Sequence, residues 1–154
     1  MGYWLFKTEP QTFSIDDLKA RARRGEFWDG VRNYQARNML RDEVARGDQV
    51  LIYHSSCAQI GVVGVAEVIR AASPDPTQFD PESDYYDPAS EPEAPRWYGV
   101  TLAHRRTLPA IVSLASLKAN PALADLALVK RGNRLSIMPV TASQWRAILA
   151  TPQV

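Results

Sequence analysis

The chain has 154 residues, of which 45% are hydrophobic and 23% charged, and its formal net charge is +1. This length is typical of one domain, and the composition excludes a disordered chain. No apolar run reaches the ~18 residues that a membrane span requires, and the first ten residues lack the pattern of a secretion signal. We therefore expect one soluble intracellular domain over residues 1–154, cytoplasmic, or nuclear in a eukaryote.

The first part of the chain predicts one strand and two helices. Residues 3–7 are short, aromatic and β-prone, and Ser14 is placed to cap a helix that runs to about residue 24. A turn built on Asp29 and Gly30 follows, over residues 27–31. Apolar residues at helical spacing then predict a second helix over residues 33–45, which we expect Gly47 to close.

A hairpin and a long loop come next. Residues 48–54 and 60–69 both read as strands, and the glycines inside the second indicate a bend or a close approach of two backbones. Residues 73–95 are rich in proline and predict a long irregular loop. Its aromatic residues indicate that this loop packs onto the body of the domain.

The last part of the chain predicts two strands and three helices. The strands cover residues 96–106 and 134–140, and the helices cover residues 113–118, 121–128 and 141–149, with Trp145 and Ile148 facing inward. Taken together, the elements favour an α+β fold. We expect a small, mostly antiparallel β-barrel or curled sheet of about five to six strands with peripheral helices, because a doubly wound fold would alternate strand and helix more regularly.

Charge is distributed unevenly along the chain. Residues 73–95 contain seven acidic residues and no basic one, whereas residues 96–154 contain eight basic residues against Asp125. Such asymmetry is typical of a surface that meets an anionic partner. It arises equally when an acidic loop and basic strands face each other, and the sequence leaves both interpretations open.

Nucleophilic catalysis and metal binding have weak support. His54, Ser55, Ser56 and Cys57 lie together at the end of a predicted strand, but their order matches no known nucleophile motif. The single cysteine cannot form an intrachain disulfide and, with two distant histidines, forms no cluster with metal-ligand spacing. We expect no enzyme activity, no metal and no cofactor.

Recognition has better support at the start of the second predicted helix, where an aromatic, a basic and an amide side chain crowd together. Trp28 and Tyr34 offer faces for stacking on a base, and Asn33 carries both a donor and an acceptor. Helix starts also suit anions such as phosphate. Each residue has a structural alternative: Trp28 as core, Asn33 as helix cap and Arg32 as a solvated charge. Trp4, from the first strand, has the same alternative as core.

Several segments, in order over nearly the whole chain, resemble the EVE domain family of the PUA-like superfamily. They include YWLFKTEP at residues 3–10, WDGVRNYQARNML at 28–40, GDQVLIYHSSC at 47–57 and RLSIMPVT at 134–141. The resemblance implies a small β-barrel decorated by helices, with an aromatic and polar pocket that accepts one base. Modified cytosine flipped out of DNA is the ligand class that this family implies.

Carried over by motif, the resemblance implies a set of pocket residues and a set of phosphate-binding residues at its rim. The pocket residues are Trp4, Lys7, Trp28, Val31, Asn33, Tyr34, His54, Ser55, Leu135 and Ser136. The rim residues are Arg32, Lys130, Arg131 and Arg134. The chain departs from the family pattern at Ser56, where many members have Asn, and at Met138, where many have Gln; if either position faces the pocket, two base-edge hydrogen bonds are lost.

The resulting hypothesis is a non-catalytic nucleic-acid-binding module that holds a single modified base, a methylated or hydroxymethylated cytosine. The alternatives are an RNA-binding PUA-like domain and a small-molecule-binding regulatory protein, which the near-neutral net charge favours. The expected partner is nucleic acid, either modified DNA or RNA, with no membrane contact, and the expected state is a monomer.

Overall fold

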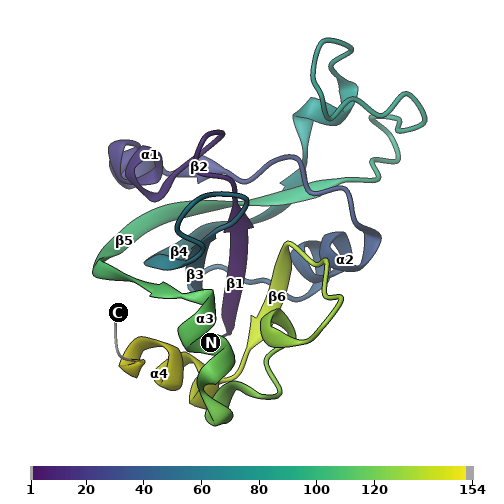
Figure 1. Cartoon of the computed structure of the whole chain (residues 1–154). Coiled ribbons are helices and arrows are strands. Elements are labelled where there is room, and N and C mark those ends of the chain that lie inside the picture. Colours follow the sequence, from purple (N-terminus) through teal and green to yellow (C-terminus); the bar gives the residue numbers. More distant parts are fainter. Residues whose placement is uncertain (1, 152–154) are drawn as a thin grey trace.

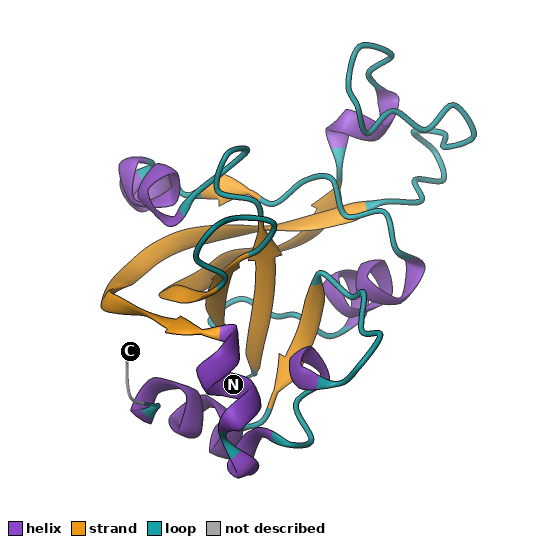
Figure 2. Ribbon diagram, viewed as in Figure 1, coloured by secondary structure: helices purple, strands orange, loops and turns teal. Residues whose placement is uncertain are grey.

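A computed structural model describes residues 2–151, in which four α-helices surround a six-stranded mixed sheet (Figure 1, Figure 2). The strands are β1 (Tyr3–Thr8), β2 (Glu26–Phe27), β3 (Gln49–His54), β4 (Gly61–Pro74), β5 (Tyr98–Ser113) and β6 (Ile137–Val140). The helices are α1 (Ile15–Ala20), α2 (Tyr34–Asp42), α3 (Leu114–Ala119) and α4 (Ala142–Ala150). No helix in this part of the chain combines the length and apolarity needed to cross a bilayer.

The sheet has the strand order β2-β5-β4-β3-β1-β6 and is antiparallel except where β1 runs parallel to β3. It is open, with β2 and β6 as its edges, and the long strands β4 and β5 curve across it (Figure 2). The predicted α+β class is confirmed, and an open sheet of this curvature is consistent with the expected barrel-like shape.

The curvature originates in the pairing of β4 with β5. The register passes from Gly64↔Thr107 directly to Val62↔Val112, so β5 bulges around Pro109, which has no N–H to pair. A Cβ atom on Gly64 would lie 2.7 Å from a β5 carbonyl oxygen, which confirms the close backbone approach indicated by the sequence. Because the strand resumes beyond the bulge, β5 is longer than the predicted strand 96–106.

The core lies on both faces of the sheet, since side chains alternate along each strand. On β1, Trp4 and Phe6 join a cluster covered by α1 and α2, whereas Leu5 joins a second cluster covered by α3 and α4. Trp145 and Ile148 on α4 are buried in the second cluster, as predicted from helical spacing.

Most helix starts follow the local sequence, and two helix ends do not. The Ser14 capping box starts α1 as predicted, but α1 stops at Ala20 because Ala22 has φ of +54°, and a single 3-10 turn completes the segment. Helix α2 ends at Asp42, before the predicted residue 45. Gly47, with φ of +93°, instead makes the turn into β3.

Four other boundaries also differ from the prediction. Strand β4 runs to Pro74, beyond the predicted residue 69 and into the segment predicted as loop. Residues 26 and 27 pair with β5 as strand β2, so the predicted turn begins later. Residues 121–128 form two 3-10 turns, Pro121–Leu123 and Ala127–Val129, where one helix was predicted. The last strand begins at Ile137, which leaves residues 134–136 in a loop.

The acidic loop, residues 73–95, is held down chiefly by polar groups. Gln78 is fully buried: its amide nitrogen donates to the carbonyl oxygens of Asp75 and Trp97, and its amide oxygen accepts from Ser90 Oγ. Asp87 accepts a 2.7 Å hydrogen bond from the Trp97 indole. The prediction that this loop packs onto the domain is therefore confirmed, although aromatic burial is the smaller part of the reason.

Candidate functional site

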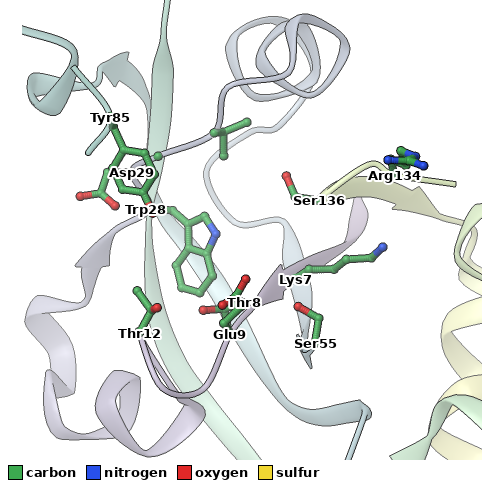
Figure 3. A pocket seen from close by; sticks show the side chains of 12 residues that line it. Lys7, Thr8, Glu9, Thr12, Trp28, Asp29, Ser55, Tyr85, Arg134 and Ser136 are labelled. Atoms are coloured by element: carbon green, nitrogen blue, oxygen red, sulfur yellow. The ribbon is translucent and has the colours of Figure 1, made fainter. Parts of the chain in front are cut away.

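A cavity of about 330 Å³ opens beside the C-terminal end of β1 (Figure 3). Its wall contains one indole, several hydroxyl groups and charges of both signs. The lining residues are Lys7, Thr8, Glu9, Thr12, Trp28, Asp29, Gly30, Val31, Ser55, Tyr85, Arg134 and Ser136. We call this cavity the first pocket.

Strand pairing brings together pocket residues that are far apart in the sequence. Because β1 and β3 are parallel, they end at the same edge, and Ser55 donates its backbone N–H to the Thr8 carbonyl oxygen at 3.0 Å. On the other side of β1, Lys7 donates its backbone N–H to the Ser136 carbonyl oxygen at 2.9 Å. The side chains of Lys7, Ser55 and Ser136 therefore lie together in the pocket wall (Figure 3).

Trp28 serves the core and the pocket at once. Trp28 is only 8% exposed. The centre of its ring lies 6.0 Å from that of Phe6 and 5.8 Å from that of Phe13, and the contact with Phe13 is edge-to-face. Trp28 also donates its backbone N–H to the Val100 carbonyl oxygen, which ties it to β5. The structural alternative considered for Trp28 is correct, and the residue still lines the pocket.

Arg32 connects this wall to the acidic loop. Its guanidinium forms a 3.0 Å ion pair with the buried Asp75 and donates to the Tyr85 carbonyl oxygen, to Thr77 Oγ1 and to the Val31 carbonyl oxygen. These bonds use all five guanidinium N–H groups. The Arg32 side chain is thus held in place by these contacts. None of its N–H groups is left free for the phosphate contact that the resemblance implies.

Arg32 also holds the acidic loop against the first pocket. The Arg32 guanidinium lies over the rings of Tyr85, at 5.5 Å, and Trp97, at 5.3 Å. The Tyr85 ring packs on Gly30 so closely that a Cβ atom there would lie 2.6 Å from it, and Gly30 has φ of +80°. Although burial raises the pKa of Asp75, hydrogen bonds from Thr77, Gly30 and Arg32 bring it below its ordinary value.

The titratable groups of the pocket give it both donors and acceptors. Loss of hydration on burial lowers the pKa of Lys7. The pKa of Asp29 is raised, first by loss of hydration and then by the neighbouring carboxylates of Asp75 and Glu26. Ammonium, carboxylate and hydroxyl groups therefore line the pocket beside Trp28, and they can both donate to and accept from a polar ligand.

Of the ten pocket residues implied by the resemblance, five line the first pocket: Lys7, Trp28, Val31, Ser55 and Ser136. The other five are engaged elsewhere. Trp4 is buried and donates its indole N–H to Asp48 at 2.9 Å, which is the core alternative. Leu135 packs against the core cluster of α1 and α2.

Asn33, Tyr34 and His54 have structural partners. Asn33 caps α2 by accepting the Ala36 N–H at 3.0 Å, and the Tyr34 ring stacks on Trp97 at 4.7 Å. His54 Nε2 accepts the backbone N–H of Ile15, the first residue of α1, at 3.1 Å. Burial lowers the pKa of His54, so the neutral form that can accept this bond is favoured.

The remaining predicted positions divide in the same way. Arg134 lines the first pocket, whereas Lys130 and Arg131 line a neighbouring cavity. Met138 is fully buried in the core, so its departure from the family pattern removes no hydrogen bond from the pocket. Ser56 is exposed with φ of +53°, a left-handed conformation that Asn adopts more readily.

Sequence reasoning missed Thr8, Thr12, Asp29, Gly30 and Tyr85 as lining residues. Thr8 and Asp29 stand inside the quoted family motifs, so the motif itself was an available signal. Tyr85 comes from the acidic loop, and no local signal connects it to residues 28–31. Among residues 2–151, no three His, Cys, Asp or Glu side chains are grouped as they would be around a metal ion.

The sheet with its two helical layers and the polar pocket beside an indole define a small α+β domain with a polar pocket at one edge of its sheet. A sequence model of the EVE domain matches residues 2–151, and the chain belongs to this family.

The relatives agree over nearly the whole chain. Mouse thymocyte nuclear protein 1 is 39% identical over 97% of this chain and 73% of its own length. A crystal structure of a Pseudomonas syringae protein has a TM-score of 0.92 at 46% identity, covering 96% of this chain and 97% of that one. The crystal structure of human THYN1 protein in complex with 5-methylcytosine-containing DNA has a TM-score of 0.92 at 36% identity, covering 97% and 96%.

Proposed function

We propose that this domain binds nucleic acid without catalysing a reaction and holds one modified cytosine, methylated or hydroxymethylated, in the first pocket. The observation that carries the proposal is the likeness, over 97% of this chain, to a structure of human THYN1 protein in complex with 5-methylcytosine-containing DNA. The pocket supports it chemically, because it offers a ring face, donors and acceptors within one small cavity.

The composition of the pocket suits the edge of cytosine. That edge presents an amino donor followed by two acceptors, the ring nitrogen N3 and the carbonyl oxygen. Asp29 and Glu9 carry acceptors for the amino group, and Lys7 carries a donor for the acceptors. A cavity of about 330 Å³ is at the small end of ligand sites, which favours a single base over a larger ligand.

The energies allow binding with modest selectivity. Extruding a base costs a few kcal/mol, and stacking on one aromatic ring returns about 1–3 kcal/mol. Burying one methyl-sized group against Val31 and Trp28 adds about 0.8 kcal/mol, roughly a fourfold preference over plain cytosine. A hydroxymethyl group that reaches a pocket hydroxyl gains more, since it adds a hydrogen bond.

Catalysis by Cys57 and His54 has little support. The Nε2 atom of His54 is occupied by the Ile15 amide, and Cys57 Sγ makes its contact with the Gln59 carbonyl oxygen at 3.4 Å. A nucleophile needs a base within hydrogen-bond reach. The non-catalytic part of the proposal rests on this arrangement.

The test is fluorescence polarisation with short duplexes that carry cytosine, 5-methylcytosine or 5-hydroxymethylcytosine, at two salt concentrations, with matching RNA. We expect tighter binding to a modified duplex and its loss in Trp28→Phe, which keeps an aromatic core but shortens the ring that lines the pocket. Trp145→Phe is the matched control, because that tryptophan is also 8% exposed but lies in the second core cluster.

Equal binding of all three duplexes would contradict the proposal. Tighter binding to RNA than to any duplex would favour the RNA-binding alternative. Absence of binding, together with a thermal shift by a small metabolite, would favour a small-molecule site.

A further inference from the structure

A small cavity of about 160 Å³ lies beside the first pocket, and four of the seven residues that line it are aromatic. The lining residues are Thr12, Phe13, Glu26, Phe27, Trp28, Asp29 and Tyr85. Four of them also line the first pocket. In Figure 3, Asp29 and Tyr85 lie on the opposite side of the Trp28 ring from Lys7 and Ser136. We call this second space the aromatic cavity.

The rings of the aromatic cavity are held in place by their own packing. The Trp28 and Phe13 rings meet at 87°, with their centres 5.8 Å apart, so they form two perpendicular walls. Phe27 belongs to β2, which pairs with β5, and a Cβ atom on Gly99 of β5 would lie 2.7 Å from its ring. A ligand that enters the aromatic cavity therefore meets ring positions that are already ordered, which lowers the entropic cost of binding.

The charged side chains that line the aromatic cavity are both acidic: Glu26 and Asp29. Glu26 pairs with Arg21 at 3.1 Å, but within residues 2–151 no other residue forms an ion pair or a hydrogen bond with the Asp29 carboxylate. Loss of hydration raises the pKa of Asp29, and the carboxylates of Asp75 and Glu26 raise it further. Arg32, the cation that opposes this shift, is committed to Asp75. A cation in the aromatic cavity would relieve this uncompensated negative charge.

The neighbourhood already holds one cation on an aromatic face. The guanidinium carbon of Arg21 lies 5.5 Å from the centre of the Phe13 ring while its Nε atom pairs with Glu26. Aromatic faces attract a cation placed within about 6 Å of the ring centre. Rings and a carboxylate thus act together on a cation at the border of the aromatic cavity, and Asp29 offers the same combination inside it.

The size of the aromatic cavity selects the kind of cation. Its 160 Å³ equals the volume of about five water molecules in the liquid, which suits a nitrogen atom with four carbon substituents. A complete base or nucleotide requires a larger site. An unmethylated ammonium is compact and strongly hydrated, and ring faces do not replace the hydrogen bonds that it gives to water. Methyl groups on the nitrogen remove that requirement and keep the positive charge.

We propose that the aromatic cavity binds a methylated ammonium group, carried either by a trimethylated lysine side chain or by a free quaternary ammonium compound. Phe13, Phe27, Trp28 and Tyr85 would supply ring faces, and Asp29 would supply the opposite charge. Tyr85 is 37% exposed and Asp29 is exposed, so a ligand can enter from the surface. The inference goes beyond the proposed function and does not depend on base binding.

The test is an NMR titration of the full chain with four probes. Two carry a methylated ammonium: Nα-acetyl-trimethyl-lysine amide and choline. The other two are their controls, Nα-acetyl-lysine amide and 3,3-dimethylbutan-1-ol, which has the shape of choline without its charge. We expect the methylated cations to shift the backbone amide signals of residues 27–30 and to bind at least about tenfold more tightly than their controls. A lower Kd for the lysine derivative than for choline identifies a protein side chain as the source, and the reverse order identifies a free compound.

Equal binding of choline and its neutral analogue would overturn the proposal, because the cavity would then be apolar without selecting a cation. Unshifted signals at residues 27–30 with both methylated probes would overturn it as well. Since no probe contains a base, a failure of modified-base binding in the polarisation assay leaves these results unaffected.

The matched variants are Asp29→Asn and Asp84→Asn. Asp29→Asn removes the free carboxylate of the aromatic cavity and should weaken binding of both methylated probes about fivefold. Asp84 is exposed on the acidic loop, outside the set of lining residues, so Asp84→Asn should bind the probes like the unmodified protein. Equal weakening in the two variants would show an effect of net charge alone and would overturn the assignment of Asp29.

Discussion

Replacing Arg32 with Gln should destabilise the domain far more than any exposed arginine would. The change leaves the carboxylate of Asp75, which has no exposed surface, without its ion-pair partner. Breaking a buried pair typically costs about 3–5 kcal/mol. Asp75 keeps hydrogen bonds from Gly30 and Thr77, and the Arg32 side chain is 22% exposed, so we expect about 2–3 kcal/mol. For a domain of this size that corresponds to a Tm lower by roughly 5–10 °C.

The assay is urea unfolding, with Arg41→Gln as the matched control. Arg41 lies on α2 and pairs with Asp42, but both side chains are exposed, at 39% and 53%, so its loss should leave the unfolding free energy nearly unchanged. The pKa of Asp75 is lower in the folded protein than in the unfolded chain, where it is ~3.9. The ion pair therefore stabilises the folded state fully above pH ~3.9, and this stabilisation is lost as the pH falls through the pKa of the folded protein. An equal loss of unfolding free energy in the two variants at pH 7 would refute the conclusion that Arg32 holds the acidic loop in place.

Three further predictions concern Asn33, Ser56 and His54. Asn33→Ala should lower the unfolding free energy by about 1 kcal/mol in urea unfolding, because α2 loses its cap. Asn33→Ser should keep both the stability and the proposed DNA binding, because serine also caps helices. Loss of DNA binding in the serine variant would mean that the Asn33 amide contacts the base. Ser56→Asn should stabilise the hairpin by about 1 kcal/mol, since Asn tolerates positive φ, and Ser56→Ala should give no gain. The unfolding free energy should rise as the pH increases from 5 to 7. The pKa of His54 is lowered in the folded protein, so the unfolded chain binds this proton at a higher pH than the folded protein does. An NMR titration that places the pKa of His54 above 6.5 would contradict the assignment.

The sequence alone determined the features that depend on neighbours a few residues apart. The predicted cap at Ser14 is confirmed, because a side chain and the backbone three residues later meet whatever the rest of the chain does. The inward positions of Trp145 and Ile148 on α4 follow from helical periodicity in the same way. The order of the predicted elements indicated the α+β class, and the family motifs added a pocket that includes Trp28 and Val31.

Only the tertiary structure decided what each pocket candidate does. Trp4 reaches Asp48, His54 reaches Ile15, and Arg32 reaches residue 75; each pair is separated by about forty residues. The parallel register of β1 with β3, the bulged pairing of β4 with β5 and the folding of the acidic loop set those distances. The glycines of β4 and the aromatic residues of the loop indicate that such contacts exist, but no local signal gives the partner or the register. Motif matching can name the residues near a site, but the direction in which each side chain points depends on packing contacts from every part of the chain.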